Sequence, residues 1–282
     1  MELLVSCLEL AREAGQRLLA SYGRVQAEVK ADGSVITAAD REVDRFLHRE
    51  IHKLYPDHEV ISEEAETVYT GRAPTWVIDP LDGTANFALG VGYWGCSIAV
   101  VTEGIPLVGV LVMPLLRLEF WAVRGGGAFL NGERLGGPAR GVSERNSFLA
   151  ICSRTWRYLG IPVRQKARLL GSAAYDLAAV AQGIAVGCSQ VLSHIWDLAA
   201  GWLLLQESGR AVGPLLPGAP DPFPMIGGLD YGGRVFPLAA AADRRFLREI
   251  QSVTRIKPEA RERFDQLAAA AWDTTACMGG RG

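Results

Sequence analysis

Cysteines are few in this sequence, and none of them forms a recognisable pair. There are five among 282 residues, an odd number, and no two are spaced as CxxC; they are Cys7, Cys96, Cys152, Cys188 and Cys277. This pattern argues against a disulfide framework and against a zinc ribbon. We expect reduced thiols and a cytoplasmic protein.

An excess of basic charge is also missing. The chain has 29 Lys and Arg against 31 Asp and Glu, a formal net charge of −2, which leaves no surplus to hold a polynucleotide backbone. The first residues have no basic segment and carry Glu2, Glu9 and Glu13, which argues against a signal peptide. The longest apolar run, residues 104–116, is short and contains two prolines, so it does not predict a membrane span. We expect neither a nucleic-acid nor a membrane partner.

The chain has enough apolar residues for a large core. Hydrophobic residues make up 49% of it, which suits one large domain or two smaller ones. Apolar residues at helical spacing predict a first helix that ends near Gly23 and a second that follows Thr37 and stops at Pro56. Residues 95–130 contain β-branched and aromatic runs between Gly and Pro, and a hairpin turn signal follows at Asn131-Gly132. These runs and the turn signal predict an antiparallel sheet.

The second half has a different pattern. A polar stretch at residues 136–146 predicts a boundary, and helix-like segments follow at 173–182 and 197–207. Residues 212–223 hold four prolines and predict a loop, and residues 257–282 predict a helical tail. We therefore divide the chain into residues 1–145, an α+β half, residues 146–256, an α/β half, and the tail.

Acidic residues follow apolar runs at several points. Asp79 and Asp82 come directly after the run at residues 76–78, Glu63 and Glu64 follow Val60-Ile61, and Asp197 lies in HIWDLAAGW. Carboxylates at strand ends are ligands for Mg²⁺ or Mn²⁺, and the lack of soft ligands argues against zinc or copper. Crowded like charges repel one another unless cations bind. The N–H groups of Gly83 and Thr84 open a predicted helix and favour an anion such as phosphate. Together these features indicate phosphate-ester hydrolysis.

Structural interpretations of the same residues stay open at this point. Asp-Pro and Asp-Gly are common in turns, the pair Glu63-Glu64 suits a solvated face, and Asp197 suits a helix N-cap. Thr37-x-x-Asp40 has the form of a capping box. A stripe of Asp40, Asp44, His48 and His52 recurs every four residues, and we interpret it as a solvated helix face rather than a metal site.

Two separated motifs resemble those of a known family. DPLDGTANF, residues 79–87, resembles the signature DPxDGTxNF of the inositol monophosphatase family, and WDLAAG, residues 196–201, resembles its second signature WDxAAG. Shorter blocks match in family order at residues 30–34, 37–40, 62–64, 171–174 and 207–209. The resemblance implies a layered αβαβα sandwich of the inositol monophosphatase and fructose bisphosphatase type, an α/β fold. It also implies a Mg²⁺-dependent, lithium-sensitive phosphatase that forms a homodimer.

The resemblance assigns roles to individual residues. Two or three Mg²⁺ ions, with Mn²⁺ as an alternative, would be held by Glu63, Asp79, the carbonyl of Leu81, Asp82 and Asp197. Thr84, paired with Asp40, would orient or deprotonate the attacking water, and Glu63 would take part in this catalytic group. The amides of Gly83 and Thr84 would bind phosphate oxygens, and Lys30 lies where the family has a lysine near the phosphate. The first half would thus carry most metal ligands.

The second half would shape the substrate pocket. By family position Ala173 and Glu207 would meet substrate hydroxyls, alongside Asp82 and Asp197. The family pattern GRxDAxxE keeps its spacing at residues 183–190, but its Arg, Asp and Glu are absent. The resemblance therefore implies a small polyol or sugar phosphate, most closely myo-inositol 1-phosphate. Histidinol phosphate and a 3′-phosphoadenosine nucleotide are alternatives, and a non-catalytic scaffold of the same fold is a third.

Overall fold

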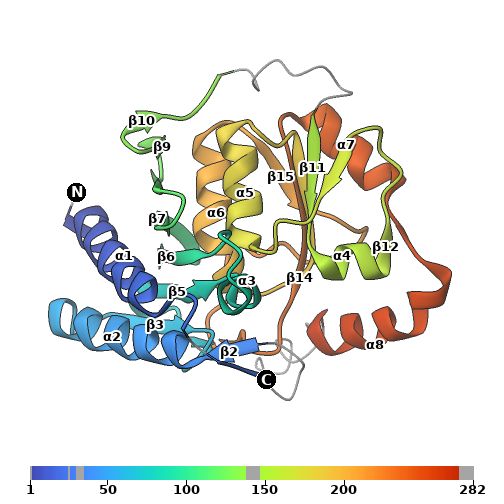
Figure 1. Ribbon diagram of the computed structural model, residues 1–282. Coiled ribbons are helices and arrows are strands. Elements are labelled where there is room, and N and C mark those ends of the chain that lie inside the picture. The colour runs from blue at the N-terminus through green and yellow to red at the C-terminus, as the bar shows by residue number, and fades with distance from the viewer. Residues whose placement is uncertain (1, 25, 30–34, 138–146, 273–282) are drawn as a thin grey trace, which may run out of the picture.

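The computed structural model describes residues 2–24, 26–29, 35–137 and 147–272. Lys30, most of the predicted boundary at 136–146, Cys277 and the end of the predicted tail lie outside these residues. The described chain folds into five layers, α-β-α-β-α (Figure 1). Mixed α/β layers of this kind confirm the predicted sandwich.

The first sheet has seven strands in the order β10-β9-β8-β7-β6-β5-β3. They are β3 (Glu59–Ser62), β5 (Thr75–Asp82), β6 (Gly95–Thr102), β7 (Ile105–Met113), β8 (Leu118–Val123), β9 (Gly127–Leu130) and β10 (Glu133–Arg134). Strands β5 to β10 pair antiparallel, as the pattern of residues 95–130 predicts, whereas β3 and β5 are parallel. The predicted turn is present, with positive φ at Asn131 and Gly132 between β9 and β10.

Helices α1 (Glu2–Ser21) and α2 (Ala38–Leu54) cover one face of this sheet (Figure 1). Both helices agree with the prediction from apolar spacing. Successive residues of a strand face opposite sides of the sheet. Accordingly Trp76 and Ile78 of β5 pack in one core with α1 and α2, while Val77 packs in a second core on the other face. Strand β5 is therefore buried along its whole length.

Helices α5 (Ala173–Gln182) and α6 (Ile195–Glu207) form the central layer between the two sheets (Figure 1). Their apolar residues share a core with Leu111 of β7 on one side and with Leu238 and Ala240 of β17 on the other. A helix buried on both sides is apolar around most of its circumference. This explains why α6 is rich in Leu and Ala and carries charged side chains only at its ends, Asp197 in the first turn and Glu207 as the last residue.

The second sheet has five strands in the order β13-β11-β14-β17-β15. They are β11 (Phe148–Ile151), β13 (Lys166–Arg168), β14 (Gly187–Ser193), β15 (Ala211–Pro214) and β17 (Phe236–Ala241). The fifth layer contains α7 (Arg244–Val253), α4 (Ser153–Tyr158) and α8 (Arg261–Trp272), of which Ile250 and Phe264 pack in the core on this face. Short pairs complete the fold: β1 (Ala27–Val29) with β2 (Val35–Thr37), β4 (Val68–Tyr69) with β16 (Leu229–Asp230), and β12 (Leu159–Gly160) with β18 (Arg255–Ile256).

One expected loop begins as a strand. Residues 211–214 form β15, the edge strand beside β17, so the loop prediction for 212–223 is wrong at its start. Pro214 ends the strand, and proline is tolerated at a sheet edge because only one side of the strand needs hydrogen bonds. The division of the chain at residues 145 and 256 stays a prediction. Core residues from both halves share one hydrophobic cluster.

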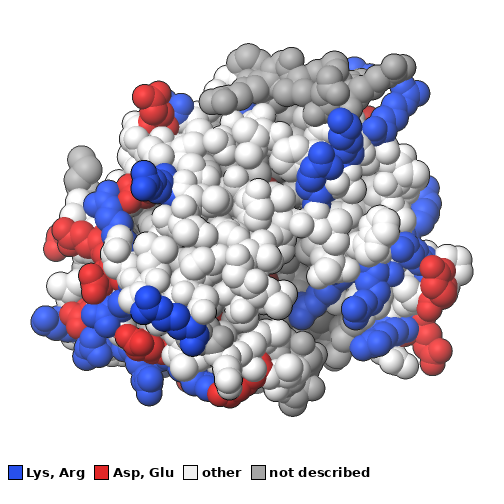
Figure 2. All heavy atoms as spheres, viewed as in Figure 1, with Lys and Arg blue, Asp and Glu red and all other residues white. Residues whose placement is uncertain are grey.

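The surface and the cysteines complete this description. In one view the centre of the molecule is largely uncharged and the charged residues gather towards its margins (Figure 2). Cys7, Cys96, Cys152 and Cys188 are free thiols, and the first two and the last are buried. Within the described residues, none of the helices combines the length and apolar character needed to span a membrane.

Candidate functional site

The end of strand β5 places two aspartates on one side of the chain. The pairing between β5 and β6 is continuous up to Asp79 opposite Ser97 and then shifts, so that Asp82 lies opposite Gly95. Such a bulge redirects side chains locally and is common beside functional sites. The Leu81 amide donates to Asp79 Oδ1 at 3.0 Å, which fixes this bulge. Both aspartates are buried, with exposures of 2% and 5%.

A third carboxylate joins them from the first turn of helix α6. One carboxylate oxygen each of Asp79, Asp82 and Asp197 lies within 4.8 Å of the other two. We call these three residues the acidic cluster. Asp197 also accepts a hydrogen bond from the His194 amide at 2.8 Å, so it caps the helix as well. The N-cap of α6 is His194 and Asp197 is the third residue of the helix, so the interpretation of Asp197 as the N-cap is wrong in position, although its carboxylate does bind the N-cap amide.

Electrostatics in the acidic cluster strongly favour a cation. Burial first, and then the neighbouring carboxylate of Asp197, raise the pKa of Asp82 to about 7. Withdrawal from water raises the pKa of Asp197 to about 6, although Arg154 opposes this. For Asp79 burial and then Glu63, Asp82, Asp197 and Asp40 all raise the pKa. Each of these shifts destabilises the ionised form, and a bound cation reverses it.

Glu63 stands beside the cluster because of strand pairing. Strand β3 runs parallel to β5 with Ser62 opposite Ile78, so the residue after Ser62 comes next to Asp79. Glu63 is half-buried, and it is the carboxylate that raises the pKa of Asp79 most after burial. The interpretation of Glu63 as part of a solvated acidic face is therefore wrong.

Thr84 and Asp40 form the hydroxyl–carboxylate pair next to the cluster. Thr84 Oγ1 lies 3.0 Å from Asp40 Oδ1 and 2.9 Å from the Leu81 carbonyl oxygen, so its proton points towards these two acceptors. Asp40 is 2% exposed, and burial raises its pKa although hydrogen bonds from Thr37 and Thr84 oppose the change. The oxygen of Thr84 is thereby left with lone pairs that can accept a proton from a bound water.

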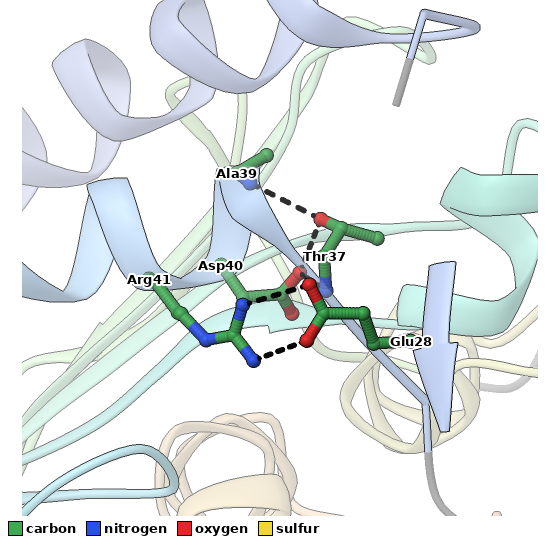
Figure 3. Close-up of polar contacts among 5 residues, drawn as sticks. All are labelled: Glu28, Thr37, Ala39, Asp40 and Arg41. Carbon is green, nitrogen blue, oxygen red and sulfur yellow. Dashed lines mark hydrogen bonds and ion pairs between the residues drawn. The ribbon is translucent and has the colours of Figure 1, made fainter. Parts of the chain in front are cut away.

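The capping box that fixes Asp40 is present as predicted. The Thr37 amide donates to Asp40 Oδ2 at 2.8 Å and the Thr37 hydroxyl donates at 2.5 Å, while the Ala39 amide donates to Thr37 Oγ1 at 3.2 Å (Figure 3). Arg41 is paired with Glu28 on the exposed side of this turn (Figure 3). The capping role and the contact with Thr84 thus coexist, because each carboxylate oxygen of Asp40 serves one of them.

Gly83 occupies the tightest point of the site. Its φ is +85°, and a Cβ there would lie 2.6 Å from the Tyr93 carbonyl oxygen. Helix α3 (Thr84–Leu89) begins directly after it, so the first N–H groups of this helix have no acceptor in a preceding turn. Asn86 Nδ2 donates to the carbonyls of Tyr93 and Leu170, both at 2.8 Å. This links the turn to the second half of the chain.

Ser172 is a site residue to which the sequence assigned no role. Its hydroxyl donates to Asp82 Oδ2, and the amides of Ala173 and Ala174 donate to the same carboxylate at 3.1 and 3.2 Å. The N-terminus of α5 thus holds Asp82, because free helix amides favour a negative charge. Ala173 therefore reaches the site, but its amide binds Asp82. The signal in the sequence is an N-cap serine that precedes an apolar helix.

Glu207 does not reach the acidic cluster. It is the last residue of α6, whereas Asp197 is the third, and ten residues of helix correspond to about 15 Å. Its carboxylate accepts hydrogen bonds from the amides of Gly125 and Gly127, both at 2.8 Å. The expectation that Glu207 meets a substrate hydroxyl at the cluster is therefore wrong, since this side chain fixes the turn between β8 and β9.

A buried polar pair lies where the family motif loses its acid. Gln190 occupies the position of the missing Glu and is 0% exposed. Its Nε2 donates to Asp176 Oδ2 at 2.6 Å. Asp176 belongs to α5, and burial and the nearby Asp82 raise its pKa. An acid at position 190 would face another buried acid, which explains why an amide fits there.

The stripe on α2 is only partly solvated. Asp40 and Asp44 are buried, and Asp44 accepts a hydrogen bond from the Ser62 hydroxyl. His48 Nε2 lies 3.5 Å from Asp44, and His52 is exposed. The interpretation of the stripe as a solvated face is therefore wrong for its first two members. Asp44 holds Ser62, the residue before Glu63.

The residues present fit a hard divalent cation. The acidic cluster offers oxygen atoms only, and its carboxylates are crowded and raised in pKa, with Asp79 and Asp82 buried and Asp197 half-buried. Mg²⁺ and Mn²⁺ prefer such ligands, whereas zinc and copper prefer nitrogen and sulfur. The Leu81 carbonyl and Glu63 lie on the same edge of the sheet and extend the oxygen-rich surface.

Comparison with protein-family models gives one match over most of the chain. The chain matches the model described as the inositol monophosphatase family over residues 2–253. It is 33% identical over 223 residues to a fructose-1,6-bisphosphatase/inositol-1-monophosphatase of Thermotoga maritima, which covers 75% of this chain and 84% of that protein. It is 35% identical over 216 residues to the Nus factor SuhB of Escherichia coli, with coverage of 72% and 81%.

Solved structures have the same architecture. A Thermotoga maritima IMPase superposes with a TM-score of 0.74 at 27% identity, covering 94% of this chain and 100% of that one. The extragenic suppressor protein suhB from Bartonella henselae superposes with a TM-score of 0.77 at 27% identity, covering 90% and 98%.

Proposed function

Because the chain belongs to the inositol monophosphatase family, we propose that it is a Mg²⁺-dependent phosphomonoesterase that hydrolyses a small polyol or sugar phosphate. The observation that carries the proposal is the acidic cluster, with the Thr84–Asp40 pair beside it. The family is of the phosphatase type, and it is metal-dependent. The specific substrate class, the magnesium and the activity of this chain belong to the proposal.

The cluster residues would hold the metal. Asp79, Asp82 and Asp197 would bind one ion, and Asp79 with Glu63 and the Leu81 carbonyl would bind another. We keep Mg²⁺ as the ion, with Mn²⁺ as the alternative. When bound, such ions lower the pKa of water and neutralise charge on a phosphate ester.

The side chains of the chain supply positioning and proton transfer. Asp40 holds the Thr84 proton, so Thr84 Oγ1 can accept a hydrogen bond from the attacking water and orient its lone pair towards phosphorus. The amides of Gly83 and Thr84 would donate to phosphate oxygens, where charge increases during the reaction. Ser172 and the α5 amides would keep Asp82 in one orientation throughout.

The substrate is proposed to resemble myo-inositol 1-phosphate. Several of the similar proteins are named as inositol monophosphatases, which supports a polyol phosphate as the substrate. One of them is the inositol-1-monophosphatase of Mesorhizobium japonicum, which is 32% identical over 229 residues. Lithium sensitivity, a homodimer and a cytoplasmic location stay predictions.

The test is a panel assay of phosphate release. Inositol 1-phosphate, histidinol phosphate, fructose 1,6-bisphosphate and a 3′-phosphoadenosine nucleotide are each incubated with the full chain, with Mg²⁺ or with EDTA. We expect Mg²⁺-dependent release that is fastest with the polyol phosphate.

The same assay addresses the scaffold alternative, to which the similarity to Nus factor SuhB draws attention. If none of the esters releases phosphate while Mg²⁺ still raises the melting temperature, the cluster binds metal without this chemistry. That result would contradict the proposed function.

A further inference from the structure

A cavity lined by basic residues lies at the opposite end of helix α6 from the acidic cluster. It has a volume of about 260 Å³ and is lined by Gln206, Arg210, Ala211, Val212, Arg244, Leu247 and Arg248. Three of these residues are arginines and none is acidic. We call Arg210, Arg244 and Arg248 the arginine triad. The cavity lies between the end of α6, the edge strand β15 and helix α7.

Arg210 is a buried cation without a partner in the described part of the chain. It is 9% exposed, and its Nε is inaccessible to water and has no hydrogen-bond partner there. Burial lowers its pKa, and no carboxylate opposes that shift. A buried guanidinium usually binds a carboxylate or phosphate through its planar donors. The unpaired state of Arg210 therefore indicates that a ligand supplies the missing acceptor.

The two other members of the arginine triad come from one face of helix α7. Arg244 and Arg248 are one helical turn apart and exposed. Like charges at this spacing destabilise a helix slightly, and no ion pair compensates them within the described ranges, whereas Arg17, Arg41 and Arg261 all form one. Three cations thus meet at one cavity without a counter-charge.

Acids close to the triad in sequence do not supply the counter-charge: Glu249 follows Arg248 but does not line the cavity, and two others are already engaged. Asp243 precedes Arg244, but its Oδ1 accepts from the Phe246 amide at 2.8 Å and caps α7. Glu207 precedes Arg210 by three residues, but both its oxygens bind glycine amides of the turn at Gly125 and Gly127. Neither carboxylate lines the cavity. None of the residues that line the cavity therefore supplies a compensating negative charge.

We propose that the arginine triad is a binding site for a free tetrahedral dianion, inorganic phosphate. Three converging cations match a charge of −2 better than the single charge of a carboxylate. A volume of about 260 Å³ admits a phosphate ion with several waters, since a water occupies about 30 Å³. It is smaller than the pockets of about 300–1,000 Å³ that bind drug-sized ligands. The length of α6 separates this site from the acidic cluster, so the proposal does not depend on the proposed activity.

Thermal unfolding of the full chain with Mg²⁺ tests this site. Inorganic phosphate is titrated against wild type, Arg210→Gln and Arg248→Gln, with acetate and chloride at equal ionic strength for comparison. Arg245→Gln is the matched control, because Arg245 is exposed on the same helix but does not line the cavity. Phosphate bound at the acidic cluster affects all variants equally, so the difference between variants reports the triad.

We expect a saturable rise in melting temperature for wild type and Arg245→Gln. In Arg210→Gln and Arg248→Gln the apparent dissociation constant should rise at least tenfold, and acetate should act more weakly than phosphate in wild type. Equal phosphate responses in wild type and Arg248→Gln would overturn the proposal, and they would indicate a general salt effect or the acidic cluster only. If Arg210→Gln does not fold, Arg248→Gln decides, because its side chain is exposed.

Discussion

Replacement of Asp82 by asparagine tests the acidic cluster most directly. The change keeps the size of the side chain and removes its charge. With Mg²⁺ present we expect phosphate release to fall by at least about 100-fold, since loss of even an outer partner of a metal ligand typically costs about 10–100-fold. The rise in melting temperature that Mg²⁺ gives wild type should shrink in parallel.

The metal-free protein should show the opposite trend in stability. The pKa of Asp82 is raised from 3.8 to about 7 in the folded chain, so folding favours the protonated form and stability falls as the pH rises from about 4 through 7. By linkage this penalty grows from about 2 kcal/mol at pH 5 to about 4 kcal/mol at pH 8, as an upper bound for a group coupled to its neighbours. Asparagine does not titrate and escapes it.

A second effect of the substitution is constant with pH. The Asp82 carboxylate accepts hydrogen bonds from the Ser172 hydroxyl and from the backbone N–H groups of Ala173 and Ala174. The side-chain NH₂ of asparagine is a donor and cannot accept such a hydrogen bond, so at least one of these bonds is lost, which costs about 1–3 kcal/mol of folding stability. The stability of Asp82→Asn relative to wild type should therefore rise between pH 5 and pH 8 by about 2–3 kcal/mol, or about 5 °C in melting temperature.

Thermal unfolding in EDTA at the two pH values measures this difference. Asp57→Asn, on the exposed surface, is the control and should show no such dependence. A difference between Asp82→Asn and wild type that is the same at pH 5 and pH 8 would refute the account of the buried charge. Unchanged Mg²⁺-dependent phosphate release would refute the assignment of Asp82 as a metal ligand.

Three further substitutions test the neighbouring parts of the site. Thr84→Val removes the hydroxyl bound to Asp40 and should lower kcat by about 100-fold or more while the stabilisation by Mg²⁺ stays close to wild type; loss of both together would point to a structural role. Gly83→Ala and its control Gly90→Ala share a positive φ, but only at Gly83 does a Cβ meet backbone. Chemical denaturation should show Gly83→Ala less stable than Gly90→Ala by about 1–3 kcal/mol, and equal losses would contradict the contact. Gln190→Glu places a second acid against Asp176 and should cost about 3 kcal/mol at pH 8 but less at pH 5, because protonation relieves the repulsion; Gln190→Met, which adds no charge, should lack this pH dependence.

Local patterns in the sequence determined much of the fold. The spacing of apolar residues located helices α1 and α2, and β-branched runs located strands β6 to β9, because backbone preferences and side-chain period act over a few residues. The break after Asp82 was also visible, since Gly83 is needed for its positive φ, although Asp79–Asp82 form the bulged end of strand β5 rather than a turn. The family motifs added the expectation of a layered sandwich, which the structure confirms.

Only the tertiary structure decided which side chains meet. Asp197 joins Asp79 and Asp82 because α6 packs between the sheets with its first turn at the end of β5, and Ser172 reaches Asp82 because α5 begins at the same point. Glu207 lies in a matching block of sequence, yet the length of α6 carries it to the opposite end of that helix from Asp197. Arg210 follows it there and becomes buried beside α7. Contacts between distant segments depend on how helices and sheets pack against one another, and no short stretch of sequence contains that information.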